Sequence, residues 1–234
     1  MTNLFDALDA TWPAAGHRDI GGWRVREGQG AGKRVSCATV IGADAPLGID
    51  TAEAAQASLG QPALFCLRAG QDAADQALAA RGYVVIDPVV LLSAPIARLA
   101  AEAPAPLSAF PLWPPLAITR DIWAEGGVGA ERQAVMDRVT GPKTAILGRA
   151  GDRAAGAVFV AVDGPVAMIH ALHVDPALRR QGLARNLMRA AARWAEGNGA
   201  TTLALAVTRA NSAANALYAS LGMLAAGHYH YRAR

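Results

Sequence analysis

The chain has 234 residues, 53% of them hydrophobic, and a formal net charge of +3 at pH 7. This length suffices for one large domain or two small ones with buried cores. The longest apolar runs are far shorter than the roughly 18–20 residues of a membrane-spanning helix, so we expect a soluble protein without a membrane partner. The first residues show no basic segment followed by an apolar one, which predicts no export signal and a cytoplasmic protein.

Charge is unevenly distributed along the chain. Residues 1–102 carry 8 Lys and Arg against 11 Asp and Glu, a net charge of −3, and residues 103–234 carry 14 against 8, a net charge of +6. Five of these arginines lie between Arg179 and Arg193. The pattern favours a compact anionic ligand bound by the second half. A nucleic-acid binder would add aromatic residues or a long basic stripe, so we expect no nucleic-acid partner.

The two cysteines, Cys37 and Cys66, lie in alternating apolar segments without metal-ligand neighbours. This context predicts reduced, half-buried thiols rather than a disulfide. No histidine spacing suggests a metal site either, so we expect no bound metal.

A proline-rich stretch, APAPLSAFPLWPP (residues 103–115), separates two segments of similar size. It cannot form a regular helix, so we interpret it as a linker or as an extended strand that starts the second half. The predicted organisation is an N-terminal domain at 1–102, a linker at 103–116 and a C-terminal domain at 117–234.

The second half alternates predicted helices and strands, which indicates a mixed α/β sandwich. A helix is expected at 130–139, strands at 144–149 and 154–162, and a hairpin turn at Asp163-Gly164 before a strand that ends at Val174. The remaining expected elements are a helix from Gly182 to Gly197, a strand at 201–207, a helix from Asn211 to Leu221 and a last strand at 227–232.

The first half ends with a similar arrangement. A predicted strand at 63–69 precedes a helix at 72–83 that closes on Gly82. An offset of 140 residues aligns 72–83 with 212–223 and matches three alanines and this glycine. We therefore predict a degenerate internal repeat.

The segment ALHVDPALRRQGLARNL (residues 171–187) places a glycine and several cations where a helix begins. A helix start leaves backbone N–H groups unpaired and carries partial positive charge. Gly182 would let a ligand approach closely, and Arg180 and Arg185 would add charge, so the pattern indicates a diphosphate site. The alternative is a simple strand-to-helix turn with solvated arginines.

Two segments of the second half resemble the signatures of one family. Residues 179–184, RRQGLA, fit the pattern Q/R-x-x-G-x-G/A of the GNAT superfamily of N-acetyltransferases. Residues 211–223, NSAANALYASLGM, are similar to its second signature, N-x-x-A-x-x-L-Y-x-x-x-G-F, with Met223 in place of phenylalanine. The two motifs occur in the family's order with a predicted strand between them. The resemblance covers residues 130–232.

This resemblance implies a fold, a co-substrate and a binding site. The fold class is α/β with a mixed sheet, a GNAT-like acetyltransferase fold in tandem with a degenerate GNAT-like N-terminal unit. The co-substrate is acetyl-CoA, whose pyrophosphate the family holds in the loop and helix start, and whose pantetheine arm binds the backbone of the preceding strand. The residues implied to bind it are Leu172, His173, Val174, Arg179, Arg180, Gln181, Gly182, Leu183, Ala184, Arg185 and Asn211.

Catalytic residues follow from the same resemblance. Tyr218 stands where GNAT enzymes keep the tyrosine that protonates the departing CoA thiolate. Its alternative role is packing, because it shares a helical face with Leu217 and Leu221. An alkylammonium acceptor, with a pKa near 10.4, must also lose a proton before it attacks a thioester, so a general base is expected.

The resemblance does not by itself assign one residue as that general base. Glutamates that serve other members have Ala206 and Met168 as their counterparts here. MIHALHV (residues 168–174) instead resembles the H-x-H-A-L-x-V of arylalkylamine acetyltransferases, which puts His170 in the position of a catalytic histidine.

Other base candidates stay open. His173 points to the opposite face of a regular strand, but a β-bulge of the kind common in GNAT enzymes would re-aim it. A hydrogen-bonded structural histidine is the alternative for both. Glu125, His228 and His230 are more remote candidates.

The first half lacks the features of a cofactor site. Its counterpart of the phosphate loop, TVIGADAPLGI (residues 39–49), has no arginine and has a proline where the helix should begin. Leu78 stands where Tyr218 stands in the second half, and residues 21–38 look like the paired N-terminal strands of some tandem GNAT proteins. We predict that this half binds no acetyl-CoA and builds part of the acceptor pocket or an interface.

The resemblance implies an acetyl-CoA-dependent N-acetyltransferase that moves the acetyl group directly onto a primary amine of a small molecule or peptide. No cysteine near the motifs offers a covalent route. The alternatives are a non-catalytic acyl-CoA-binding sensor and a structural protein. The acceptor and a homodimer as partner stay open, although the few acidic residues of the second half disfavour polyamines and aminoglycosides.

Overall fold

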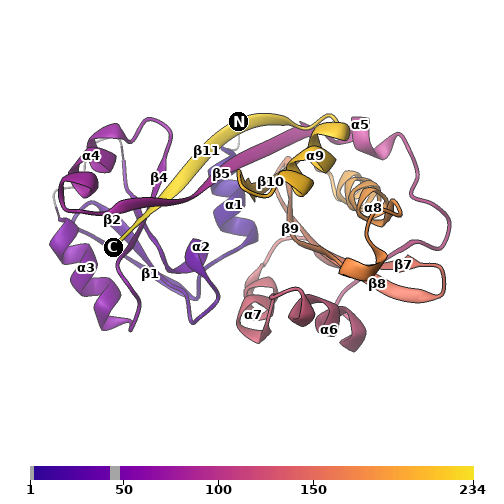
Figure 1. The fold of residues 1–234 in the computed structure, drawn as a ribbon, viewed down its shortest axis with the longest axis horizontal. Helices are drawn as coiled ribbons and strands as arrows, with labels where there is room; N and C mark the ends of the chain where they lie inside the picture. Colours follow the sequence, from indigo (N-terminus) through magenta and orange to yellow (C-terminus); the bar gives the residue numbers. More distant parts are fainter. Residues whose placement is uncertain (1–2, 43–47) are drawn as a thin grey trace.

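The computed structural model describes residues 3–42 and 48–234 of the chain. Its strands form one mixed, eleven-stranded sheet that runs through two lobes flanked by helices (Figure 1). The first half of the chain contains α1 (Leu4–Thr11), β1 (Gly16–Ile20), β2 (Trp23–Glu27), α2 (Lys33–Ser36), β3 (Ala38–Val40), α3 (Ile49–Ser58), β4 (Leu64–Arg68), α4 (Asp72–Ala80), β5 (Val84–Pro95) and α5 (Ile96–Ala100). The second half contains β6 (Ala109–Leu112), α6 (Ala117–Glu125), α7 (Ala130–Arg138), β7 (Lys143–Ala150), β8 (Arg153–Asp163), β9 (Val166–Val174), the short 3₁₀ helix η1 (Pro176–Leu178), α8 (Leu183–Gly197), β10 (Thr202–Thr208), α9 (Ser212–Ser220) and β11 (Leu224–Ala233).

The elements predicted for the second half are all present, with strands slightly longer than expected. The helix predicted after Gly182 is α8, and its Leu187 and Ala191 are fully buried, as the helical period predicts. Asn211 caps α9, since its side-chain oxygen accepts a hydrogen bond from the backbone N–H of Ala214 at 3.1 Å. Within the described residues, no helix is both long and apolar enough to cross a bilayer.

The first half and the proline-rich segment also match their predictions in outline. Residues 109–112 form β6, which pairs antiparallel with β7, so part of the segment is the extended strand that starts the second half. The range 21–38 contains β2, which pairs antiparallel with β3, but the short helix α2 lies between them. The strand and helix predicted at 63–69 and 72–83 are β4 and α4.

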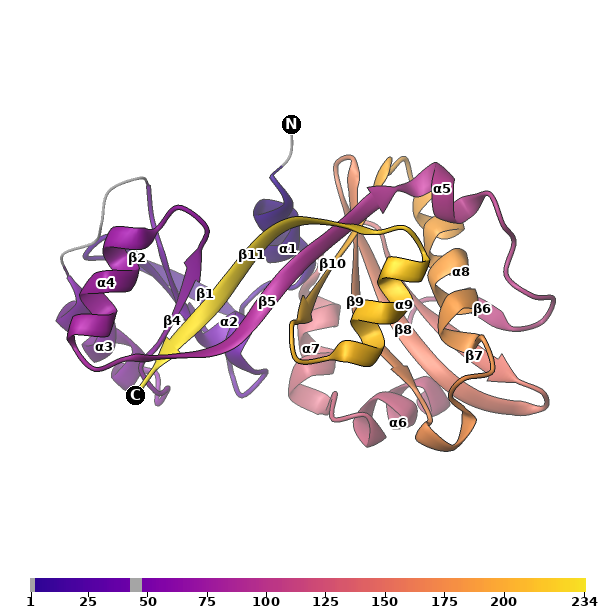
Figure 2. The ribbon, with the colours of Figure 1, turned by 45° about the horizontal axis from the view of Figure 1, so that its top comes forward.

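The two halves exchange their last strands. The sheet order is β1-β2-β3-β4-β11-β5-β10-β9-β8-β7-β6. The last strand of the second half, β11, therefore pairs with β4 of the first half, and the last long strand of the first half, β5, pairs with β10 of the second. Figure 2 shows β5 and β11 as two long strands that run side by side from one lobe to the other.

The pairing register repeats with the same period as the sequence. An offset of 140 residues carries α4 (Asp72–Ala80) onto α9 (Ser212–Ser220). The same offset relates two exchanged pairs, Leu64 with Ala233 and Ser93 with Ala204. This register is stronger support for the predicted internal repeat than the four identical residues are. It places a pseudo-two-fold axis between β5 and β11.

The exchange bears on the predicted domain boundaries. The division into 1–102, 103–116 and 117–234 stays a prediction, but the two halves are not separate in space. Residues 224–233 lie between two strands of the first half, and α1 packs against β8 and β9 of the second.

A hydrophobic cluster fills the junction between the halves. It gathers buried side chains from six elements that include α1, β5 and β11, among them Leu8, Cys66, Leu91, Met168 and Tyr231. Both cysteines of the chain are free thiols and are more fully buried than predicted. The junction is thus a packed core shared by both halves.

Truncating the junction should destabilise both halves together. Leu91 is fully buried in this cluster, so Leu91→Ala should lower the free energy of unfolding by about 2–5 kcal/mol in urea denaturation, in a single transition. The matched control is Leu224→Ala, because this leucine is 72% exposed and should change stability by less than about 0.5 kcal/mol. Two separated transitions, with only one of them shifted by Leu91→Ala, would contradict a shared core.

Candidate active site

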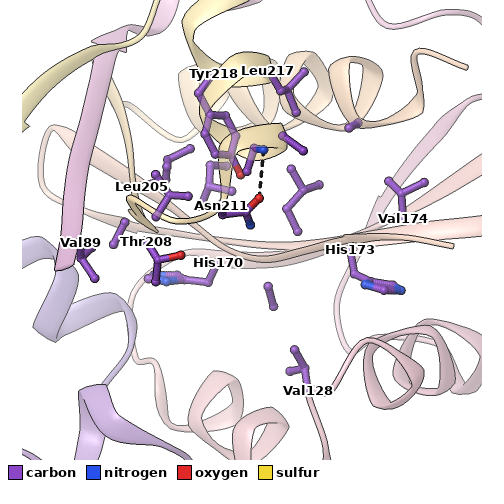
Figure 3. A pocket seen from close by; sticks show the side chains of 18 of the residues that line it. Val89, Val128, His170, His173, Val174, Leu205, Thr208, Asn211, Leu217 and Tyr218 are labelled. Carbon is purple, nitrogen blue, oxygen red and sulfur yellow. Dashed lines mark hydrogen bonds between the residues drawn. The ribbon is translucent and has the colours of Figure 1, made fainter. Parts of the chain in front are cut away.

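A cavity opens where two central parallel strands part. β9 and β10 pair from Val166 and Thr202 only as far as Ile169 and Leu205. β10 continues along β5 to Thr208, and β9 continues along β8 to Val174. A cavity of about 1250 Å³ occupies this divergence, bounded by α8, α9 and the first half of the chain (Figure 3).

Almost every residue predicted to act in the site lines this cavity. Tyr218, His170 and the predicted cofactor residues are among its lining residues, with the one exception of Gln181. The first half contributes a second set that the motifs did not indicate, namely Trp12, Ala31, Gly32, Lys33, Arg34, Asp87 and Val89.

The start of α8 has the properties of an anion site. Gly182 has a φ of +82°, a conformation that favours glycine, and a Cβ built there would meet no atom within 4 Å. The backbone N–H of Asn186 donates to Gly182 O, and it is the first N–H of the helix that has an acceptor among the described residues. The preceding N–H groups are free to bind an anion, with the helix dipole aligned in its favour.

Of the three arginines around this helix start, two are hydrogen-bonded to other parts of the chain and the third is exposed to solvent. Arg179 Nε donates to Val174 O at 3.0 Å, which ties the loop to the end of β9. Arg185 donates to Ser220 Oγ at 3.0 Å and so bridges α8 to α9. Arg180 is exposed, and its φ of +66° turns the chain into the glycine. Open space above Gly182, free N–H groups and guanidinium groups together fit the pyrophosphate of a coenzyme A ester.

Tyr218 and Asn211 come from opposite ends of the same helix. Tyr218 is 6% exposed, and burial raises the pKa of its hydroxyl to about 12. Figure 3 shows its ring directed from α9 toward the strands, near the hydrogen bond that caps the helix at Asn211. The Asn211 side-chain oxygen is engaged in that cap, so a ligand would meet its amide nitrogen.

A β-bulge in β9 determines where the two histidines point. Phe159 pairs with His170 and Ala157 with His173, so β9 has one residue more than β8 across this interval. Ala171 lies in this interval and has a φ of +50°. Its carbonyl accepts a hydrogen bond from Trp123 Nε1 at 2.9 Å. The bulge therefore brings His170 and His173 to the same face, as expected for a bulged strand.

His170 is held on both ring nitrogens. Thr11 donates its hydroxyl hydrogen to Ala7 O at 2.6 Å, so its oxygen accepts the Nε2–H of His170 at 2.9 Å. The other nitrogen, Nδ1, accepts from Arg34 at 3.2 Å, and the ring stacks on Trp12 with centroids 4.9 Å apart. Burial and the Arg34 charge hold the pKa of His170 well below 6.5.

This arrangement argues against His170 as the general base, since its only lone pair is occupied. His173 differs, because no described residue is hydrogen-bonded to its ring, which packs against Gly126. It lines the cavity, is half-buried, and has a pKa lowered by burial and by Arg179. It is thus a neutral imidazole at neutral pH with a ring nitrogen available to a ligand.

The remaining base candidates lie outside the cavity. His230 is hydrogen-bonded to Asp75 at 2.7 Å, and neither it nor His228 nor Glu125 is among the lining residues. Of the two positions where other members keep glutamates, Ala206 lines the cavity and Met168 is fully buried. Within the part of the chain that the structure describes, no cluster of three or more His, Cys, Asp and Glu could hold a metal ion.

The corresponding place in the first half is filled by protein. The loop before α3 was predicted as a degenerate phosphate loop, of which residues 43–47 lie outside the described residues. At its end, a Cβ on Gly48 would come within 2.8 Å of Gly21 Cα, because the turn between β1 and β2 packs against the start of α3. Leu78, the counterpart of Tyr218, is completely buried. Both features support the prediction that this half binds no acetyl-CoA.

The individual residues that the first half contributes were missed for a physical reason. Trp12 and Arg34 line the cavity because the ends of α1 and α2 pack at the junction, and no local pattern in the sequence reports such a contact. The one available signal was the predicted internal repeat, from which the first half was expected to build part of the acceptor pocket or an interface.

The second half matches one protein family. Residues 115–223 match the family described as Acetyltransferase (GNAT) family. Among curated protein sequences, none matches the chain.

Solved structures resemble the whole chain at low sequence identity. A functionally unknown conserved protein from Staphylococcus epidermidis has a TM-score of 0.73 at 8% identity, over 96% of this chain and 95% of that one. A GCN5-related N-acetyltransferase from Kribbella flavida has a TM-score of 0.70 at 16% identity, over 96% and 91%. A tandem GNAT protein from the clavulanic acid biosynthesis pathway has a TM-score of 0.58 at 17% identity, over 78% and 66%. These likenesses confirm the predicted fold class, a mixed α/β GNAT-like fold in tandem.

The buried state of His170 should appear in the pH dependence of stability. Because its pKa is lowered in the folded chain, the unfolded chain binds more protons below pH 6.5, and stability falls as the pH decreases through that value. One such group contributes a slope of up to about 1.4 kcal/mol per pH unit. In urea denaturation between pH 5 and 7, His170→Gln should remove this part of the slope. An unchanged slope would mean that His170 titrates equally in both states.

Proposed function

Because residues 115–223 belong to the GNAT acetyltransferase family, we propose that this protein transfers an acetyl group from acetyl-CoA directly to a primary amine. The acceptor is a small molecule or peptide. The observation that carries the proposal is the meeting, in one cavity, of the open glycine at the start of α8 with the buried hydroxyl of Tyr218.

In this proposal the two diverging strands and α8 bind the co-substrate. The N–H groups after Gly182, with Arg180 and Arg185, hold its pyrophosphate, and the free edge of β9 at Leu172–Val174 holds its pantetheine arm. When bound, acetyl-CoA supplies a thioester whose C–S bond breaks as the amine nitrogen forms the new amide bond. No cysteine is among the described residues that line the cavity, which supports direct transfer.

Tyr218 is the proposed general acid. With a pKa of about 12, its hydroxyl stays protonated throughout the physiological range and can give its proton to the leaving sulfur. The buried ring fixes the direction of the hydroxyl at little entropic cost.

The acceptor amine must either enter the site in its neutral form or lose a proton there before it attacks the thioester. Cations around the cavity oppose the ammonium form and thereby lower the pKa of a bound amine. We propose His173 as the group that accepts the remaining proton, in place of His170. Support comes from its position in the lining, its unengaged ring and its lowered pKa, which keeps it neutral at pH 7.

Substituting the acid should slow chemistry and leave binding intact. Tyr218→Phe should lower kcat for acetylation of a primary amine by about 10²-fold, measured by thiol release over a panel of amines, with unchanged affinity for acetyl-CoA. In the wild type, kcat/KM should not decline up to pH 10, because the Tyr218 pKa is about 12.

The matched control is Tyr83→Phe, since the Tyr83 hydroxyl donates to Glu53 and is outside the cavity. It should leave kcat unchanged. Wild-type protein that binds acetyl-CoA but acetylates no amine in the panel would favour the non-catalytic sensor, for which the missing glutamates at positions 168 and 206 are the specific support.

A further inference from the structure

We propose that the acceptor amine carries a carboxylate and that Arg34, from the first half of the chain, binds this carboxylate. The inference rests on the proposed acetyl transfer, and it names the class of acceptor: amino acids and other amines with a carboxylate near the reacting nitrogen.

Arg34 is a cation in the cavity without an anionic partner. It belongs to the short helix α2 and lines the cavity beside His170. Among the described residues it forms no ion pair, and its Nε is buried without any hydrogen-bond partner. A buried guanidinium N–H without an acceptor costs on the order of 1–3 kcal/mol, so the protein alone leaves this cation incompletely satisfied.

The carboxylates that could neutralise Arg34 are already engaged. Asp87, which lines the same cavity, is paired with Lys33. Asp9 lines a small adjoining cavity with Arg34, but it is bound to Arg26 at 2.8 Å and to Arg68 at 3.0 Å. The charge of Arg34 is therefore left for a ligand.

The guanidinium is held in a defined orientation. Thr11 sets the tautomer of His170, and His170 Nδ1 then accepts one N–H of Arg34 at 3.2 Å. The Arg34 guanidinium carbon also lies 6.0 Å from the ring centroid of Trp12. A planar, pre-oriented guanidinium matches the two oxygens of a carboxylate, and its side chain loses little freedom on binding. His170 is thus a positioning residue for Arg34, which accounts for its engaged nitrogens.

The charge of the whole cavity agrees with an anionic acceptor. Among its described lining residues, Asp87 is the one acid. Arg179, Arg180 and Arg185 are at the end proposed for the pyrophosphate, and Lys33 is paired with Asp87, which leaves Arg34 and Arg132 for the acceptor. An acceptor that bears only an ammonium would be repelled here, whereas an added carboxylate turns the same field into attraction.

The test measures binding of the products, so it does not depend on turnover. Wild-type protein saturated with CoA is titrated calorimetrically with N-acetyl-L-amino acids that have small, apolar or aromatic side chains, and with the corresponding carboxamides. We expect the carboxylate to bind at least about 10-fold more tightly than its carboxamide, consistent with a charge-assisted pair.

Arg34→Gln should remove this preference, and Arg34→Lys should retain part of it because the charge remains. The matched control is Arg24→Gln, since Arg24 pairs with Asp19 on the exposed hairpin of the first half and should leave the preference unchanged. Circular dichroism verifies the fold of each variant.

Equal binding of carboxylates and carboxamides by the wild type would overturn the inference, as would a preference that survives in Arg34→Gln. Either result leaves amine acetylation itself intact. Conversely, carboxylate-selective binding by a protein that acetylates no amine would uphold the role of Arg34 and contradict the proposed reaction.

Discussion

The pairing of β5 with β11 is the constraint on which the rest of the structure depends. Each strand leaves its own half and completes the sheet of the other. β10 follows β5 along its full length but follows β9 only to Leu205. The opening that contains the candidate active site therefore lies beside a strand supplied by the first half. The same exchange brings α1 and α2 to its rim.

Two related halves have acquired different tasks. In the second half, Gly182 faces open space and Tyr218 lines the cavity. In the first half, the backbone of Gly21 fills the space at the start of α3, and Leu78 replaces the tyrosine. The first half instead contributes Arg34 and Trp12, and His170 of the second half helps to orient the Arg34 guanidinium. In our proposal, one unit binds the co-substrate and the other the acceptor, within a single cavity.

Local patterns in the sequence predicted much of this fold and part of the site. The helical period predicted α8, because the apolar residues of this helix are buried along one face. The glycine and arginines before α8 and the helix that carries Tyr218 were recognisable because their chemistry is contained in short segments. A bulge in β9 was foreseen as a condition for the orientation of His173, and the register of β8 and β9 contains it.

Other features depend on contacts between distant segments. The partner of a strand is not encoded in its own alternation, so the exchange of β5 and β11 could not be read from either strand. His170 was predicted as a base from its position in a motif, whereas its bonds to Thr11 and Arg34 join residues more than a hundred positions apart. No pattern in the sequence indicated a role for Arg34, for the same reason.

We propose that the start of α8 is the acetyl-CoA site and that the chain has one such site. Calorimetric titration with acetyl-CoA tests it most directly, with Gly182→Glu compared against Gly199→Glu. Both glycines have a φ near +80° and open space around the Cβ position, so the two substitutions introduce similar backbone strain, but Gly199 lies beyond the opposite end of α8. We expect one acetyl-CoA to bind per chain, and we expect this binding to be lost in Gly182→Glu and kept in Gly199→Glu. Two molecules per chain, or unchanged binding in Gly182→Glu, would contradict it.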